Sequence, residues 1–415
     1  MFPGKFKEPT TQIKNLDQLI GDKLNVKVKK HTAEPLTQFG ENFGSEILKV
    51  NITVEEHDGT EREIHAVAKL IPPTEMQLEI FNTQVTFKNE IGFYEEIVGA
   101  MRDFQREHGV EPTKAFAELY GARINLEPGS HKVDNDGIIV MENLKIAGFD
   151  VIDRFEGFDL NGAKKILTTI AEFHATVLAI KIKKPEIFHT KINPYLTELV
   201  LDKAPPFELG NLLEQNPATA HLASKVKQKI VEKKHVKKQR EPWATISHND
   251  LWVNNIMVKK SRDGDIQEVK LVDFQAPDLA SPACDLLFFL FSSVQEPVLR
   301  FHFDRLVQWY FKEAINTLSK YKVNLEQFTF ESFKEELKAE SHREMYHAMF
   351  MLNVVLGPKG GLPEMPGKAP EWSPNGNSNP RKQAATNDFM KAKFPAGFRE
   401  KVCCFVELAE KQKWI

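Results

Sequence analysis

The period of the hydrophobic pattern changes along this chain, and that change limits the folds it can adopt. Residues 48–54 and 64–70 alternate apolar with polar side chains, as half-buried strands do, and the turn-forming pair Asp58-Gly59 lies between them. These runs predict a β-hairpin in which Lys69 points away from the apolar face. From about residue 75 the apolar residues recur at helical spacing instead, on a stripe of Phe87, Ile91, Tyr94, Val98 and Met101.

Short strand-like runs recur in two further places. Two of them, at 116–124 and 137–144, complete a strand-rich first third. Two more, at Ile256–Lys260 and Val269–Phe274, flank the turn Asp263-Gly264-Asp265 within a chain that is otherwise mainly helical after about residue 148.

This order of elements predicts two lobes. At roughly 100–200 residues per domain, a chain of 415 residues suits two or three folding units. We expect an α+β, bilobal fold with a small antiparallel β-sheet lobe over residues 1–143 and a larger, mainly helical lobe over residues 144–415. Clusters of glycine and proline predict a long loop at 357–383.

Composition and charge argue against several classes of protein. The chain carries 55 basic and 58 acidic residues, a formal net charge of −3, which gives no overall attraction to nucleic acid or anionic membranes. No apolar run approaches the ~20 residues of a membrane-spanning helix, and the first residues show no secretory signal. The three cysteines form no CxxC pair, so neither a disulfide framework nor a zinc site is indicated. We expect a cytoplasmic protein with no membrane span and no nucleic-acid partner.

One stretch carries most of the chemical information: His248-x-Asp250 followed by Asn255, with Asp273 a further 18 residues along. Transfer of a phosphoryl group from a nucleotide needs a carboxylate to accept the acceptor's proton and oxygen ligands that hold Mg²⁺ beside the phosphates. The spacing is that of a kinase catalytic loop, which assigns Asp250 as the base and Asn255 and Asp273 as the Mg²⁺ ligands. The same spacing selects Asn255 over Asn254.

A cation is also needed to fix the phosphates from the other side, and Lys69 can supply it. Glu90, 21 residues later and on the predicted helix, can form an ion pair with this lysine. We expect His248 to prop the catalytic loop. Each residue has a plainer alternative, because an isolated Asp or Asn in a turn is usually a cap or turn former and Lys69 could be an ordinary strand lysine. The joint order and spacing favour the catalytic interpretation.

Taken together, these residues resemble the kinase-like small-molecule phosphotransferases, the group that contains choline and aminoglycoside kinases, and more narrowly the insect ecdysteroid kinase-like family. The resemblance implies a protein-kinase-like fold in which the small lobe binds the nucleotide and the helical lobe carries the catalytic and substrate-binding groups. It also implies ATP- and Mg²⁺-dependent phosphorylation of a hydroxyl on a small apolar molecule, in the best-known case an ecdysteroid alcohol. The matching blocks run through most of the chain: Phe39–Ser45, Lys69, Phe87–Tyr94, Met141–Leu144, Glu172–Ala175, His248–Met257, Asp273–Gln275 and Ser281–Leu286.

The resemblance implies roles for two further sets of nucleotide-binding residues. The first set falls where the family has its phosphate-holding glycine loop, although two glycines four apart are also common in ordinary turns; it comprises Gly40, Asn42, Gly44 and Ser45. The second set, Glu142 and Asn143, falls at the hinge between the lobes, where backbone groups would contact adenine. The end of a strand explains these two residues equally well.

Two residues of the helical lobe are expected to be structural. Asp285 resembles the family's aspartate that accepts backbone amides from the catalytic loop; its plain alternative is an acid at a helix N-terminus, stabilised by the helix dipole. His174 lies on the same helical face as Ile170 and Val177, and we expect it to pack in the core.

Departures from protein kinases narrow the substrate. Asn249 stands where protein kinases usually carry an arginine, and Trp252 stands where serine/threonine kinases place a lysine. Asp285 follows Asp273 by only 12 positions. This spacing leaves little room for a peptide-binding segment, so a protein substrate is disfavoured. Three hypotheses remain: a kinase of an ecdysteroid-like steroid alcohol, a kinase of a choline-like amine or xenobiotic alcohol, and an inactive pseudokinase that binds an apolar ligand.

Overall fold

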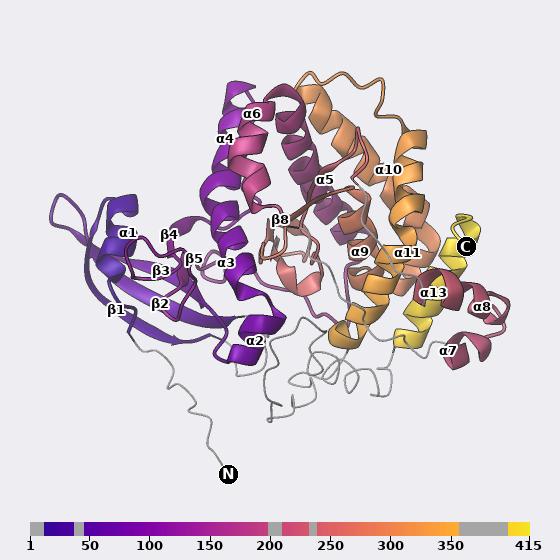
Figure 1. Cartoon of the computed structure of the whole chain (residues 1–415), viewed down its shortest axis with the longest axis horizontal. Helices are drawn as coiled ribbons and strands as arrows, with labels where there is room; N and C mark the ends of the chain where they lie inside the picture. The colour runs from indigo at the N-terminus through magenta and orange to yellow at the C-terminus, as the bar shows by residue number, and fades with distance from the viewer. Residues whose placement is uncertain (1–11, 37–44, 198–209, 232–238, 357–396) are drawn as a thin grey trace, which may run out of the picture.

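A five-stranded antiparallel sheet forms the small lobe (Figure 1). The computed structural model of the chain describes residues 12–36, 45–197, 210–231, 239–356 and 397–415. The strand order is β1–β2–β3–β5–β4, with bounds, in that order, of Lys27–Pro35, Glu46–Glu55, Glu61–Leu70, Ile138–Glu142 and Leu119–Arg123. The predicted hairpin is confirmed as β2 and β3, which pair through their full length.

The alternation along β2 and β3 sorts the two faces of this sheet. One face packs against helix α1 (Leu16–Leu24) and forms a small core that includes Leu48, Val50, Ile52, Val54, Ile64, Ala66 and Ala68. Lys69 lies on the other face, where it meets the helices that follow the hairpin. The edge strand β1 was not apparent from the hydrophobic pattern because three of its nine residues are lysines and most of its side chains are exposed. Such lysines discourage an edge strand from pairing with another chain.

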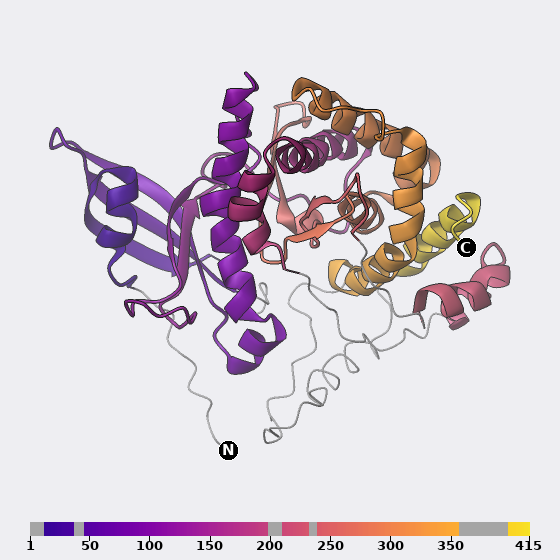
Figure 2. The same ribbon diagram turned by 45° about the horizontal axis from the view of Figure 1, so that its top comes forward.

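The predicted helical stripe is confirmed, and it lies between the sheet and the large lobe. Four segments follow β3 and its Pro72-Pro73 stop: α2 (Glu75–Ile80), α3 (Thr83–Gly92), the π-helical turn η1 (Phe93–Ile97) and α4 (Val98–Glu107). All five residues of the predicted stripe are buried, and they belong to the large hydrophobic core rather than to the core of the sheet. Figure 2 shows this run of helices, in purple, between the sheet and the other helices.

The large lobe is mainly helical, as predicted. Its long helices pack in pairs, α5 (Leu160–Lys183) against α10 (Glu296–Lys320) and α9 (Ala283–Ser293) against α11 (Phe330–Val355), with α13 (Phe398–Lys411) in contact with α10 and α11. Asp159 caps α5 by accepting a hydrogen bond of 2.7 Å from the N–H of Gly162. The shorter helical segments are α6 (Pro185–Ile187), η2 (Phe188–Ile192), η3 (Asn193–Tyr195), α7 (Gly210–Glu214), η4 (Ala220–Leu222), α8 (Ala223–Val226), η5 (Lys227–Val231) and η6 (Val253–Asn255).

Two short antiparallel ribbons interrupt these helices: β6 (Thr245–Ser247) pairs with β9 (Asp278–Ala280), and β7 (Ile256–Lys260) with β8 (Ile266–Leu271). The predicted strand Val269–Phe274 is wrong at its end, because β8 stops at Leu271. Asp273 has a left-handed backbone, with φ of 71°, which a β-strand cannot contain.

The arrangement confirms the predicted α+β, bilobal, protein-kinase-like class. The predicted loop at 357–383 lies outside the described residues.

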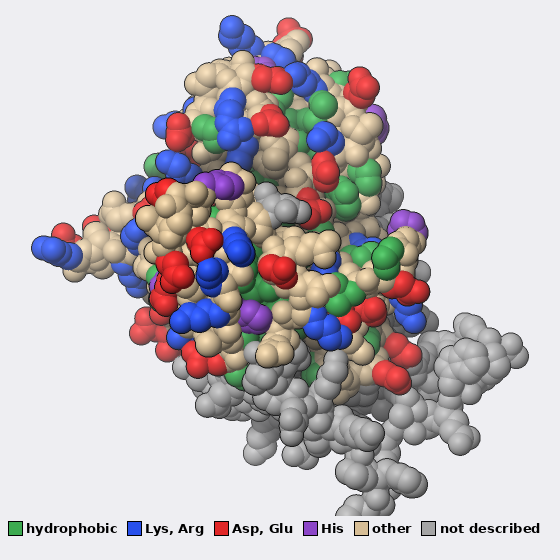
Figure 3. All heavy atoms as spheres, turned by 90° about the vertical axis from the view of Figure 1, so that its left-hand side faces the viewer, with side chains coloured by type: hydrophobic (Ala, Val, Ile, Leu, Met, Phe, Trp, Pro, Cys, Tyr) green, Lys and Arg blue, Asp and Glu red, His purple; other side chains and the backbone are tan. Residues whose placement is uncertain are grey.

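Figure 3 shows acidic and basic side chains interspersed over the end of the molecule formed by the small lobe. Among the helices of the described residues, none combines the length and apolar character needed to cross a bilayer.

Candidate active site

The predicted catalytic loop runs from His248 to Asn255 between the two ribbons. Because β6 leads into the loop and β7 leads out of it, strand pairing holds both of its ends. Asn249 has a left-handed backbone, with φ of 65°, a conformation that Asn tolerates better than most residues. Its side-chain amide donates a hydrogen bond of 2.8 Å to the carbonyl of Ala276, which ties the loop to the segment that follows Asp273.

Asp285, buried in the first turn of α9, fixes this loop. Its carboxylate accepts hydrogen bonds from the backbone N–H groups of His248 (2.6 Å) and Asn249 (2.9 Å) and from the hydroxyl of Ser247 (2.8 Å). Burial alone would raise the pKa of Asp285, but hydrogen bonds from His174 and from the backbone of His248 hold that pKa well below its usual range. These are the contacts expected of the aspartate that supports a catalytic loop.

His174 is a further donor to Asp285, and sequence reasoning underrated it. The prediction of core packing holds, since His174 is 2% exposed. Its ring also lies 3.0 Å from Asp285 through Nε2 and 2.7 Å from the Tyr310 hydroxyl through Nδ1. The one sequence signal for this role was the Glu172–Ala175 block of the family resemblance.

The ring of His248 hydrogen-bonds at both nitrogens, in its neutral form. Its Nε2 lies 2.9 Å from the carbonyl of Val272, and the N–H of Asp250 donates to its Nδ1 at 3.3 Å. A carbonyl can only accept and a backbone N–H can only donate, so the proton sits on Nε2. Burial lowers the pKa of His248, which keeps the ring neutral.

Asp250 and Asn255 lie in contact. The Asn255 Nδ2 donates to the Asp250 backbone carbonyl at 2.8 Å and to its Oδ2 at 3.0 Å, whereas Asn254 is exposed. Burial and the nearby Asp273 carboxylate raise the pKa of Asp250 well above its usual value, against hydrogen bonds from Asn255 and the Trp252 side chain. A carboxylate with a raised pKa is suited to accept a proton from an alcohol.

Lys69 brings the two lobes together at this site. Its Nζ lies 2.6 Å from Glu90 Oε2 and 2.6 Å from Asp273 Oδ1. Burial disfavours the charged ammonium, but Asp273 and Glu90 outweigh burial and raise the pKa of Lys69. Burial, together with the Asp273 carboxylate and opposed by Lys69, raises the pKa of Glu90 to about 7. The predicted Lys69–Glu90 pair is present, and Asp273 shares the lysine with Glu90.

The structure says less about the predicted nucleotide-binding residues of the glycine loop and the hinge. Gly40, Asn42 and Gly44 lie outside the described residues, and Ser45 directly precedes β2. At the hinge, the N–H of Glu142 donates to the carbonyl of Glu118 at 2.8 Å, and the N–H of Asn143 donates to that of His65 at 3.3 Å. Neither N–H can therefore bind adenine without giving up a hydrogen bond within the protein.

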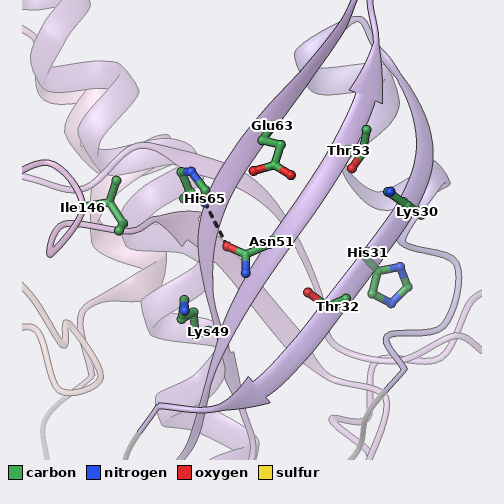
Figure 4. Close-up of a pocket in the computed structure, with 9 residues that line it drawn as sticks. All are labelled: Lys30, His31, Thr32, Lys49, Asn51, Thr53, Glu63, His65 and Ile146. Atoms are coloured by element: carbon green, nitrogen blue, oxygen red, sulfur yellow. Dashed lines mark hydrogen bonds between the residues drawn. The ribbon is translucent and has the colours of Figure 1, made fainter.

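A polar pocket of about 380 Å³ lies on the Lys69 face of the sheet (Figure 4). His65 and Lys69 are four residues apart on β3, so both side chains point to this face, roughly 13 Å apart along the strand. Asn51 Oδ1 and His65 Nδ1 are hydrogen-bonded at 2.8 Å, and Ile146, 60% exposed, borders the pocket from the segment after β5. Sequence reasoning did not single out Asn51 or His65.

A second set of ligand-type side chains lies buried in the large lobe. Cys284, Glu340 and Glu344 each place one ligand atom within 4.8 Å of the others. Both carboxylates already face arginines, since Glu340 pairs with Arg240 at 2.5 Å and Glu344 pairs with Arg343. Because these cations neutralise the carboxylates, we assign no metal ion to this set.

A sheet lysine paired with a helix glutamate, close to Asp273 and to the loop of Asp250 and Asn255, is the arrangement expected of a kinase-like phosphotransferase. The sequence matches the model of the ecdysteroid kinase-like family over residues 39–323, which is more than half of the 415 residues. The chain belongs to the ecdysteroid kinase-like family. No curated protein sequence matches it.

Three solved structures are similar to the chain at low identity. A spectinomycin phosphotransferase in complex with ADP and spectinomycin is 14% identical, covers 97% of this chain and 100% of its own, and has a TM-score of 0.40. An amicoumacin kinase in complex with AMP-PNP and Ca²⁺ is 12% identical, covers 86% of each chain, and has a TM-score of 0.34. The GDP complex of an aminoglycoside 2′-phosphotransferase is 12% identical, covers 80% of this chain and 90% of its own, and has a TM-score of 0.32. At these TM-scores the likenesses add nothing to the account of the site.

Proposed function

We propose that this protein is an ATP-dependent kinase that transfers the γ-phosphoryl group to a hydroxyl of a small molecule. One observation carries the proposal: side chains from both lobes and from positions up to 204 residues apart converge on one site. These side chains are Lys69, Asp250, Asn255 and Asp273. A purely structural site has no need of two aspartates beside a buried lysine, whereas phosphoryl transfer uses all four residues.

Asp250 is the proposed base. The acceptor oxygen forms a bond to the γ-phosphorus, the bond from that phosphorus to the β–γ bridging oxygen breaks, and ADP leaves. The hydroxyl proton passes to the Asp250 carboxylate, whose raised pKa favours its capture. The side chains of Asn255 and Trp252 orient that carboxylate.

Asp273 and Asn255 are the proposed Mg²⁺ ligands. The donor chemistry fits: Asp273 offers a carboxylate, and Asn255 turns its amide nitrogen toward Asp250, which leaves the amide oxygen for a cation. The Asp273 side chain is 36% exposed, so a solvated ion can reach it. A bound Mg²⁺ would neutralise charge on the phosphate oxygens. Lys69, held by Glu90, would contact the phosphates.

We place the base of the nucleotide toward the polar pocket. A nucleotide with phosphates at Lys69 would extend along the sheet face to Asn51 and His65, next to the hinge residues Glu142 and Asn143. With both hinge N–H groups occupied, Asn51 and His65 offer polar side chains on the same face of the sheet. The proposed phosphate-binding residues of the glycine loop remain Gly40, Asn42, Gly44 and Ser45.

We propose a small apolar acceptor, with an ecdysteroid-like steroid alcohol as the first candidate and a choline-like amine or xenobiotic alcohol as the alternative. Family membership supports this class. The short segment from Asp273 to Asp285 supports it too, because it offers no extended platform for a peptide. The proposed compartment is the cytoplasm. With the four site residues present, an inactive carrier is the weaker interpretation.

A melting experiment tests the nucleotide half of this proposal. ATP at 100 times its dissociation constant adds about 2.7 kcal/mol of stability to a protein that binds it only when folded. We expect a rise in melting temperature with ATP and Mg²⁺ and a smaller rise when EDTA removes the metal ion. Identical melting curves with and without Mg²⁺·ATP at millimolar concentration would contradict the proposal.

A further inference from the structure

The helix that carries Glu90 is anchored to the large lobe, although it precedes the hinge in sequence. Ile91, Phe93 and Tyr94 belong to the same hydrophobic core as helices α5 and α9. The separate core of the sheet is formed with α1, and none of its described members comes from α3. The face of the sheet that carries Lys69 also meets this large core, because Ile139, the partner of Lys69 on β5, belongs to it.

A short stretch of the large lobe, residues 193–197, braces this helix on one side. The ring of Tyr195 packs so closely on Gly92 that a Cβ at Gly92 would overlap it. The hydroxyl of Thr197 lies 3.4 Å from Oδ1 of Asn89, the neighbour of Glu90, and its N–H donates to the carbonyl of Pro277 at 3.0 Å. One residue thus contacts both the helix of Glu90 and the loop of Asp273.

A stacked pair of rings holds the same helix on a second side. Phe93 and Phe274 stack with centroids 3.5 Å apart and planes at 5°. Phe93 follows Gly92 directly and begins the π-helical turn, and Phe274 follows Asp273 directly. Both Phe93 and its neighbour Tyr94 are buried.

We infer that residues 193–197 are a positioning brace, which fixes α3 to the loop of Asp273 so that Glu90 and Asp273 meet Lys69 together. Gly92 is required because only a residue without a Cβ admits the Tyr195 ring. The brace therefore joins α3 directly to the loop of Asp273. The kinetic consequence rests on the proposed kinase function, but the geometry of the brace does not.

A methyl group placed on the helix tests the brace. Gly92→Ala should lower turnover about tenfold by displacing Glu90 from Lys69. The matched control is Gly99→Ala in the same helical run, where an added Cβ meets nothing within 4 Å, and it should keep wild-type turnover. Tyr195→Ala, which removes the ring and leaves Gly92 in place, should also lower turnover, because α3 loses the same contact. Wild-type turnover in both Gly92→Ala and Tyr195→Ala would overturn the brace.

Hydrogen exchange of the protein without nucleotide provides a readout that does not depend on activity. Gly92→Ala should speed amide exchange in residues 83–97 and in residues 273–278, because the brace couples them, and Gly99→Ala should speed neither. If Gly92→Ala does not fold, Thr197→Val, which keeps the size and removes the hydroxyl, should speed exchange in 83–97. Exchange equal to that of the wild type in both segments would overturn the inference. If the variants exchange as expected but the wild type transfers no phosphoryl group, the proposed function alone is refuted.

Discussion

The catalytic loop and the lysine of the sheet are held by different forces. The loop is fixed inside the large lobe by hydrogen bonds to one buried carboxylate, Asp285. Lys69 is held by two ion pairs of 2.6 Å, to Glu90 on helix α3 and to Asp273. The proposed base therefore lies in a loop that is hydrogen-bonded within one lobe, whereas the position of Lys69 depends on two charged partners from separate segments.

Replacing the proposed base should have the largest effect, and it probes the loop that Asp285 fixes. Asp250→Ala should lower turnover by about 10²–10⁴ because the acceptor proton loses its destination. Affinity for ATP should stay nearly intact, since the loop is held by Asp285 and not by Asp250. Steady-state kinetics and nucleotide titration measure both. The exposed turn residue Asp263 provides the control, as Asp263→Ala, and equal activity in the two variants would remove the base assignment.

Removing the carboxylate that supports the loop should cost stability. Asp285→Ala leaves the buried N–H groups of His248 and Asn249 without an acceptor, and should lower the free energy of unfolding by roughly 3 kcal/mol. Urea denaturation measures the change. Folding lowers the pKa of Asp285, so its contribution is complete above the unfolded pKa of about 3.9 and is lost as the pH falls toward the folded value. The gap between wild type and variant should therefore shrink in acid.

The matched control for that change is Asp265→Ala, at an exposed position in the β7–β8 turn. Its stability should stay within about 0.5 kcal/mol of the wild type. Equal stability of the Asp285 and Asp265 variants would show that the loop does not depend on one carboxylate, and would remove the contrast drawn between the two regions.

The Lys69 side of the site is tested by Asp273→Asn, which keeps the shape of the side chain and removes its charge. Binding of Mg²⁺·ATP should weaken roughly tenfold, the equivalent of one charge-assisted contact. Calorimetric titration with and without Mg²⁺ separates the metal-dependent part of the affinity, which should carry the loss. An unchanged affinity for Mg²⁺·ATP would count against Asp273 as a ligand.

The smallest effect is expected at the pocket. His65→Ala should raise the KM for ATP about fivefold, through loss of about 1 kcal/mol of hydrogen bonding, and leave turnover unchanged. Glu61→Ala, at an exposed position on the same strand, should leave both parameters at wild-type values. A wild-type KM in the His65 variant would place the base of the nucleotide elsewhere.

Local patterns predicted those parts of the site that depend on one element at a time. Strand alternation put Lys69 on the face away from the sheet's core, and helical spacing put Glu90 on a buried helix that could meet it. The spacing of Asp250, Asn255 and Asp273 is likewise a property of one loop and the ribbon beside it. The sequence could bring these residues together because neither periodicity nor loop length depends on distant parts of the chain.

Contacts between distant segments were not predictable in the same way. His174 and Asp285 are 111 residues apart, and the apolar neighbours of His174 on its helix gave no sign of a polar partner. Tyr195 and Thr197 lie in a stretch without periodicity, so nothing in their sequence pointed to Gly92 or Asn89. The sequence placed Glu142 and Asn143 at the end of a strand. The hydrogen bonds that occupy their N–H groups depend on neighbouring strands, which the local pattern does not show.

The most direct test of the account is the mass of the acceptor after reaction. Purified protein is incubated with Mg²⁺·ATP and a panel of sterols, amines and phenolic alcohols, beside the Asp250→Ala variant. The account predicts that at least one acceptor gains the mass of a single phosphoryl group with the wild type, and that the yield falls by two orders of magnitude or more with the variant. An acceptor phosphorylated equally by both proteins, or no phosphorylated product across the panel despite binding of Mg²⁺·ATP, would contradict it.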